Sequence, residues 1–185
     1  MASPYGHALA GLGLFNLCYP RWSASRKKTG LIYGLVILGA CCPDLDFLPG
    51  VLVGNPSRFH HGPYHSLGMA IGFSLIAGVL IAIRGKKVPW VKATGFVFVL
   101  IFSHLILDFM TEDLNPPYGF PLFWPFSGTY HISPWTILPH VERNFYNPAI
   151  WDQIVRVVIM ESLFFLPFFI LSRWVRGHGD EAPFK

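Results

Sequence analysis

The chain alternates between five apolar segments and shorter polar segments, and this alternation is its main structural signal. The last three segments are close to the roughly 20 residues that a helix needs to cross a bilayer. The first two are shorter, so they either borrow flanking residues to span or enter the membrane and return. The five segments are residues 4–19, 30–42, 65–83, 88–110 and 150–175. The pattern predicts an all-α, polytopic membrane bundle of about five spans.

Composition supports a membrane protein with a single domain, residues 1–185. Hydrophobic residues make up 52% of the chain, and the mean hydropathy is +0.45. The formal charge of +4 does not indicate a nucleic-acid partner, because the basic residues fall in short loops, where they set membrane orientation. Residues 111–149 form a long segment rich in Pro and aromatic residues, which is typical of the membrane interface. Cys18, Cys41 and Cys42 lie in apolar runs and are expected to be small buried side chains.

Basic residues are distributed unevenly between the two ends of the predicted spans. Only Arg58 and Arg143 lie in the loops at one end. The other end carries Arg21, Arg26, Lys27, Lys28, Arg84, Lys86, Lys87, Lys92, Arg173, Arg176 and Lys185. The positive-inside rule therefore predicts a cytoplasmic C-terminus and an N-terminus that faces outward, into the periplasm if the membrane is the bacterial inner membrane.

This orientation brings one set of polar residues to the same membrane surface. The set comprises His7, Asp44, Asp46, His60, His61, His65, His104 and Asp108. Randomly scattered polar residues would divide between the two surfaces, so their convergence predicts a functional site at the outer surface.

Carboxylates and imidazoles concentrated beside apolar segments predict a metal site. His104 and Asp108 are four residues apart and share one face of a helix. A metal that hydrolyses esters needs such ligands, an open position for water and a nearby base. Zinc is the first expectation, with manganese or iron as alternatives, and their number is open. The predicted ligands are His7, Asp44, Asp46, His60, His65, His104 and Asp108, of which Asp44, Asp46 and His65 are also predicted to be catalytic.

Purely structural roles are the alternative for both clusters. Asp44 and Asp46 can form a turn after Pro43, since Asp favours turns. His104 and Asp108 can be a helix-end pair that hydrogen-bonds to neighbouring backbone.

Four further ionisable residues have open roles. Glu161 lies in the middle of a predicted span, where an ionisable group is a functional candidate, although a protonated Glu bonded to a neighbouring helix is the favoured interpretation. His131 and His140 belong to the outer segment, and interfacial roles are favoured for both. His61 is a weaker ligand candidate than its neighbours.

The order of the motifs resembles a known family. After a His in the first apolar segment come PDLDF (43–47), HHGPYHSL (60–67), SHLILDFMT (103–111) and FPLFWPFS (120–127). Over roughly residues 5–130 this order resembles the bacterial YdjM-type family of inner-membrane proteins, described as metal-dependent hydrolases and in some members as LexA-binding. The family's third motif looks like His-Arg-Gly-x-Thr-His-Ser. His60 and His65 match its histidines, whereas His61 and Tyr64 replace its Arg and Thr.

The family is in turn distantly similar to zinc-dependent phospholipase C and the S1/P1 nucleases. Those enzymes are helical, hold several metals and use a His-x-x-x-Asp helix pair like His104 and Asp108. The resemblance implies a phospholipase C-like metal site at the helix ends and a phosphoester substrate.

Together these features predict a membrane-bound, metal-dependent hydrolase that cleaves a phosphoester of a lipid or lipid-linked substrate, with the aromatic residues 120–135 at the lip of its site. One alternative is a non-enzymatic metal-binding or transport protein, whose ionisable residues should continue through the bilayer. The other is a membrane interaction or regulatory module, which needs a larger cytoplasmic surface. The substrate, the oligomeric state and the identity of the general base stay open.

Overall fold

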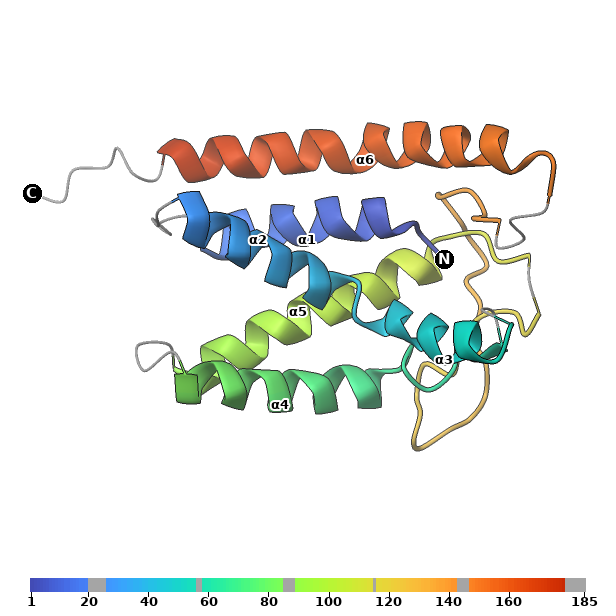
Figure 1. Ribbon diagram of the computed structural model, residues 1–185, viewed down its shortest axis with the longest axis horizontal. Helices are drawn as coiled ribbons and strands as arrows, with labels where there is room; N and C mark the ends of the chain where they lie inside the picture. Colours follow the sequence, from blue (N-terminus) through green and yellow to red (C-terminus); the bar gives the residue numbers. More distant parts are fainter. Residues whose placement is uncertain (20–25, 56–57, 85–88, 115, 143–146, 179–185) are drawn as a thin grey trace, which may run out of the picture.

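The chain folds into a bundle of long helices with irregular segments gathered at one end (Figure 1). The computed structural model describes residues 1–19, 26–55, 58–84, 89–114, 116–142 and 147–178. The elements are α1 (Pro4–Cys18), α2 (Arg26–Ala40), the 3-10 helix η1 (Pro43–Asp46), α3 (Phe47–Leu52), α4 (Leu67–Arg84), α5 (Trp90–Phe109) and α6 (Ile150–His178). Within these residues the only β-structure consists of two isolated bridges, so the predicted all-α class is confirmed.

The helices pack as two layers joined by α5. α6 lies along α1, α1 packs on α2 and α5, and α4 packs on α5. Phe15, Val36 and Leu100 form one core cluster where α1, α2 and α5 meet. A second cluster, around Ile101 and Leu105 of α5, includes Phe120 from the irregular segment. That contact ties the segment after α5 to the helix ends.

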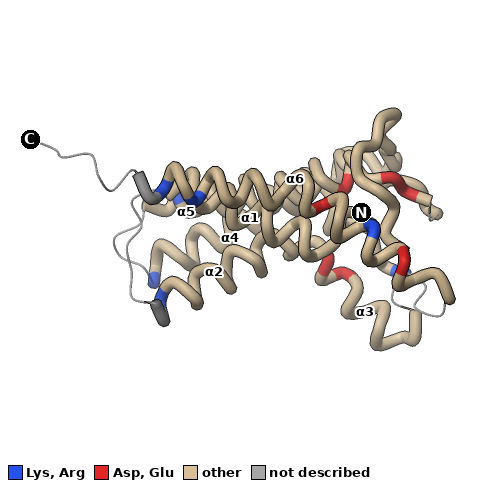
Figure 2. The backbone as a smooth tube through the Cα atoms, turned by 90° about the horizontal axis from the view of Figure 1, so that it is seen from above, with Lys and Arg blue, Asp and Glu red and all other residues tan. Residues whose placement is uncertain are grey.

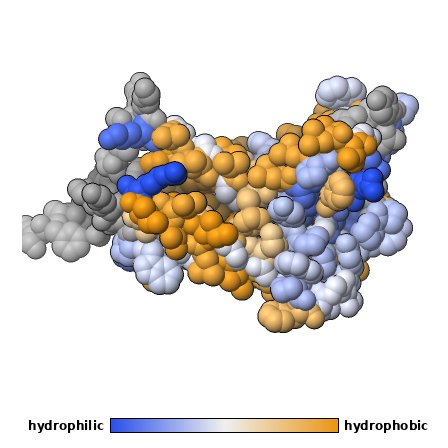
Figure 3. Space-filling model, turned by 60° about the horizontal axis from the view of Figure 1, so that its bottom comes forward, coloured by the Kyte–Doolittle hydropathy of each residue, from blue (hydrophilic) through white to orange (hydrophobic). Residues whose placement is uncertain are grey.

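Three helices, α4, α5 and α6, are long and apolar enough to cross a membrane. A fourth candidate is the pair formed by residues 28–40 of α2 and residues 43–52, which bends by 65° at the break and is either a broken span or a re-entrant loop. α1 has 15 residues, fewer than a perpendicular crossing needs. The structure therefore supports three or four spans, while the fifth stays a prediction. Figure 3 shows hydrophobic surface over the helices and a more hydrophilic surface at the end with the irregular segments.

Acidic and basic side chains gather at opposite ends of the bundle. Figure 2 shows most Lys and Arg near the C-terminal end of α6 and the Asp and Glu residues near the N-terminus and α3. Five of the basic residues that predict the orientation lie outside the described residues: Arg21, Lys86, Lys87, Arg143 and Lys185. The described charges agree with the predicted asymmetry, and the direction of insertion stays a prediction.

The segment between α5 and α6 covers the acidic end of the bundle. Its backbone pairs Thr111 with Leu138 and Phe120 with His131. It also closes the start of α4, where the Leu67 N–H donates to the Leu122 carbonyl at 2.9 Å. Gly68 lies so close to the Trp124 carbonyl that a Cβ atom would collide with it. The aromatic segment is thus fixed beside the histidines that precede α4.

Candidate metal centre

Four side chains from three parts of the chain meet at the acidic end of the bundle. Asp44 comes from η1, His65 from the loop before α4, and His104 and Asp108 from α5. One ligand atom from each lies within 4.8 Å of the corresponding atoms of the others. We call these residues the four-residue cluster. All four were predicted from the sequence as ligands, and the structure brings them together.

Short distances connect the atoms of the four-residue cluster. Asp108 Oδ2 lies 3.1 Å from His104 Nε2 and 3.4 Å from His65 Nε2. Asp44 Oδ1 lies 3.5 Å from both Nε2 atoms. The helical spacing of four residues explains why His104 and Asp108 face the same point. Asp44 reaches it because the chain turns after α2, with Pro43 at the first position of η1, which proline tolerates.

The histidines of the cluster are held from behind. His104 Nδ1 donates a hydrogen bond to the Ala40 carbonyl at 2.8 Å, an arrangement that leaves the Nε2 lone pair directed at the carboxylates in the neutral ring. His65 Nδ1 lies 3.0 Å from Asp46 Oδ2 without hydrogen-bond geometry, and the negative charge of this carboxylate favours a proton on Nδ1. Such outer partners orient imidazole ligands in metal sites.

Asp46 lies behind the cluster, between two histidines. Its Oδ1 accepts a hydrogen bond from His60 Nδ1 at 2.8 Å, while its Oδ2 faces His65. The His60 ring also stacks on Phe47, with ring centroids 3.9 Å apart. This position makes Asp46 an orienting residue for both imidazoles.

His60, His61 and His65 form a second group whose nitrogens could share an ion. His61 Nδ1 lies 3.5 Å from Asp113 Oδ2, and its backbone adopts a φ of 61°, in the left-handed region that non-glycine residues rarely occupy. Burial lowers the pKa of His61 to about 3, so the ring is neutral at pH 7. The sequence argument ranked His61 below its neighbours, yet the structure places it in this group.

His7 approaches the cluster from α1. Its Nε2 lies 3.2 Å from Asp108 Oδ1, and its ring stacks on His104 with centroids 3.7 Å apart. The Ala2 N–H donates to the same Asp108 oxygen at 2.8 Å. Asp108 Oδ1 is thus engaged by the N-terminal segment, which leaves Oδ2 for the cluster.

His7 and Asp46, which the sequence predicts as ligands, border the four-residue cluster but belong to neither group. The remaining polar residues singled out in the sequence also lie outside both groups. Glu161 is buried and accepts hydrogen bonds from the N–H and the hydroxyl of Ser3, so it joins α6 to the start of α1. His131 and His140 belong to neither group, and the interfacial roles favoured for them stay predictions. Asp113 was missed by the sequence argument. The sequence offers only an acidic residue four positions after the end of α5. In the structure, the Gly119 N–H donates a hydrogen bond to Asp113 Oδ2 at 2.8 Å.

A divalent cation fits the chemistry of the four-residue cluster. Both Asp44 oxygens and Asp108 Oδ2 are buried without a hydrogen-bond partner. Buried carboxylates are costly unless a cation or donors compensate them. Burial by itself disfavours a charged His65, but contacts with Asp108, Asp44 and Asp46 raise its pKa well above the usual value. The site therefore demands positive charge, and its mixture of imidazole and carboxylate suits zinc, manganese or iron.

The chain matches one family model, described as YdjM inner membrane protein, over residues 1–178. Comparisons with curated proteins and with solved structures found no match.

Proposed function

We propose that this chain, which belongs to the YdjM inner membrane protein family, is a metal-dependent hydrolase that cleaves a phosphoester of a membrane lipid or lipid-linked substrate. The observation that carries the proposal is the four-residue cluster at the end of an apolar bundle, in which both Asp44 oxygens and Asp108 Oδ2 are buried without a hydrogen-bond partner. Burying these carboxylates is costly unless a cation compensates their charge, and a bound metal with its water would do so.

The chain's own residues divide into ligands and supports. Asp44, His65, His104 and Asp108 would hold the metal, and the group of His60, His61 and His65 could hold another. When bound, such a metal lowers the pKa of water and polarises a phosphoryl oxygen. Asp46 and the Ala40 carbonyl keep the imidazole protons on Nδ1, so that the Nε2 atoms stay available.

Asp44 is our candidate for the general base. Its side chain is 10% exposed, whereas those of His65, His104 and Asp108 are fully buried. Asp44 Oδ2 also has no hydrogen-bond partner. Only Asp44 Oδ1 lies within 3.5 Å of the imidazoles of the cluster, so the buried Oδ2 is left to accept the proton of a water held there. The sequence alone left the choice between the Asp residues open.

A hydrolysis assay with a matched control tests the proposal. Wild-type protein loaded with zinc or manganese in detergent should release phosphorylated headgroup from a panel of phospholipids, and Asp44→Asn should lose at least about 100-fold of that rate. Asp152→Asn, an exposed Asp near the start of α6, should keep full activity. Metal-loaded wild type with no hydrolysis of any phosphoester would contradict the enzymatic proposal.

Metal transport is the competing function, and one observation bears on it. Buried polar side chains continue along the α1–α6 interface, where Asn16 Nδ2 donates to Ser172 Oγ at 3.3 Å and Arg176 donates to Asn16 Oδ1 at 3.0 Å. These groups bond to one another as polar contacts between membrane helices do. Zinc or manganese flux into proteoliposomes, carried by wild type and absent from the Asp44→Asn variant, would favour transport over hydrolysis.

A further inference from the structure

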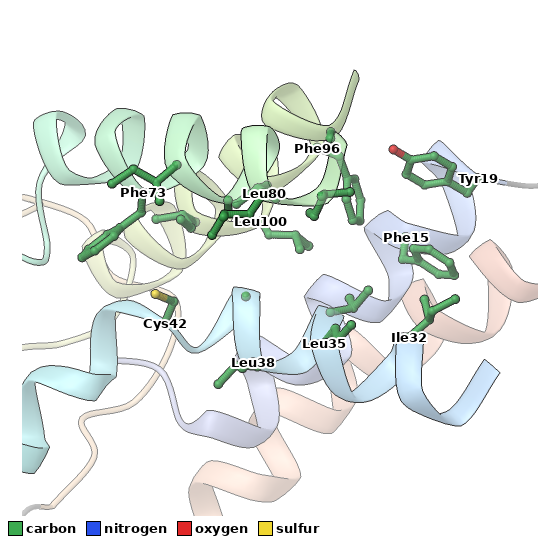
Figure 4. A pocket seen from close by; sticks show the side chains of 18 of the residues that line it. Phe15, Tyr19, Ile32, Leu35, Leu38, Cys42, Phe73, Leu80, Phe96 and Leu100 are labelled. Carbon is green, nitrogen blue, oxygen red and sulfur yellow. The ribbon is translucent and has the colours of Figure 1, made fainter. Parts of the chain in front are cut away.

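An apolar groove of about 580 Å³ runs along the bundle between α2 and α4, with α5 as its floor. Its walls are formed by α2 and α4, which both pack on α5. Phe15 of α1 and Tyr19, which follows α1, lie at one end of the groove (Figure 4). Its lining includes Leu35, Leu38, Phe73, Leu80, Phe96 and Leu100. None of the described residues that line it is charged. The groove is therefore suited to hydrocarbon.

One end of the groove meets the metal site along two separate elements. On α5, Leu100 and Ile101 line the groove, and His104 follows within one helical turn. After α2, Cys42 and Leu45 line it, and Asp44 lies between them in the sequence. A molecule that fills the groove thus has one end next to two residues of the four-residue cluster.

The length of the groove matches one leaflet of a membrane. Its walls extend from Ile32 to Gly39 on α2 and from Phe73 to Ile81 on α4, which correspond to about 11–12 Å at the rise of an α-helix. Cys42 and Leu45 continue the lining beyond the end of α2. The helical part of the groove is thus close to half of the roughly 30 Å thickness of the hydrocarbon core. Several wall residues, including Leu38 and Leu80, are about half exposed on the surface that faces lipid. A hydrocarbon chain can therefore enter from the side, within a single leaflet.

From these features we infer that the groove binds one hydrocarbon chain of the substrate, so that the phosphoester next to that chain lies at the four-residue cluster. The identity of the bound molecule as a substrate rests on the proposed hydrolase function, but its binding in the groove does not. The groove would thereby select membrane lipids over water-soluble phosphoesters. Binding energy from the chain, remote from the reacting bond, would position the headgroup.

Substitutions that fill the groove test this inference. Ala77→Trp, from α4, and Leu38→Trp, from α2, place a large side chain in the groove from opposite walls. Ala82→Trp is the matched control, because Ala82 belongs to the same helix as Ala77 and does not line the groove. Thermal unfolding of each variant identifies any that does not fold, and a second groove variant remains if one fails.

The first readout is binding and needs no catalysis. The probe is a phosphatidylglycerol with a diazirine in the middle of one acyl chain, present in vesicles of phosphatidylglycerol and phosphatidylethanolamine. Peptides that contain groove residues should be labelled in wild type and in Ala82→Trp, and labelling should fall about tenfold or more in both groove variants. Labelling spread evenly over the lipid-facing helices, or unchanged by the groove variants, would overturn the inference.

The second readout separates the groove from the proposed reaction. Groove variants should lose about tenfold or more of the rate on a phospholipid and keep the rate on bis(p-nitrophenyl) phosphate, which has no hydrocarbon chain. Equal loss on both substrates, or loss on neither, would contradict substrate binding in the groove. Specific groove labelling with no hydrolysis by wild type would retain the lipid site and remove the hydrolase proposal.

Discussion

Asp46 gives the sharpest test of how the centre is built, because one isosteric substitution separates an orienting role from a ligand role. Its two oxygens face His60 Nδ1 at 2.8 Å and His65 Nδ1 at 3.0 Å. In Asp46→Asn the side chain keeps its shape but offers one acceptor oxygen and an NH₂ group that only donates. One of the two imidazoles must lose its acceptor and with it the fixed position of its proton.

The expected magnitude follows from what such partners contribute in metal sites. Loss of an outer hydrogen-bond partner weakens metal binding by about 10- to 100-fold, which equals about 1.4–2.7 kcal/mol. We therefore expect Asp46→Asn to bind zinc about 10- to 100-fold more weakly than wild type, and Asp44→Asn, which alters a ligand, to lose more. Competition with a chromophoric chelator in detergent measures both affinities.

Asp152→Asn is the control, since it removes an exposed carboxylate near the start of α6. Zinc affinity unchanged in Asp46→Asn would refute the orienting role. Loss as large as in Asp44→Asn would show that Asp46 is itself a ligand.

Three further predictions concern stability, and thermal unfolding in detergent measures all of them. Glu161→Ala removes the acceptor of the Ser3 N–H and should destabilise the protein by about 1–3 kcal/mol, whereas Glu161→Gln should retain most of the stability. Gly78→Leu collides with Thr94 where α4 packs on α5 and should cost about 1–3 kcal/mol, whereas Gly95→Leu, which meets open space, should be nearly neutral; similar losses in both would contradict the packing. A strong chelator should lower the unfolding temperature of metal-loaded wild type but leave that of His104→Ala unchanged, and an equal shift in both would argue against binding at this site.

Much of the fold could be predicted because the apolar segments are long and clearly bounded. The sequence places helices at 65–83, 88–110 and 150–175, and the structure has Leu67–Arg84, Trp90–Phe109 and Ile150–His178. The number of spans was harder to predict. The 65° break after Ala40 depends on how the chain turns through Pro43, and hydropathy does not record such a bend. The groove between α2 and α4 is a tertiary feature that no local pattern indicates.

The meeting of the four cluster residues was predictable because they lie at the same ends of the spans predicted from the sequence. That reasoning identifies which residues meet, but it cannot assign their atoms. The sequence treats Asp44 and Asp46 alike, whereas the structure directs Asp44 at the cluster and Asp46 at two Nδ1 atoms behind it. The contribution of Asp113 depends on how the segment after α5 folds back, for which the sequence offers only an acidic residue in an irregular region.

Metal content is the most direct test of the central claim that this end of the bundle is a metal centre. Elemental mass spectrometry should be carried out on detergent-purified wild type and on the double variant His104→Ala, Asp108→Ala, with Asp152→Asn as control. We expect at least about one equivalent of zinc, manganese or iron in wild type and in the control, and its loss from the double variant. Wild type that binds no metal even after reconstitution, or a double variant that keeps the metal, would show that this end of the bundle is not a metal centre.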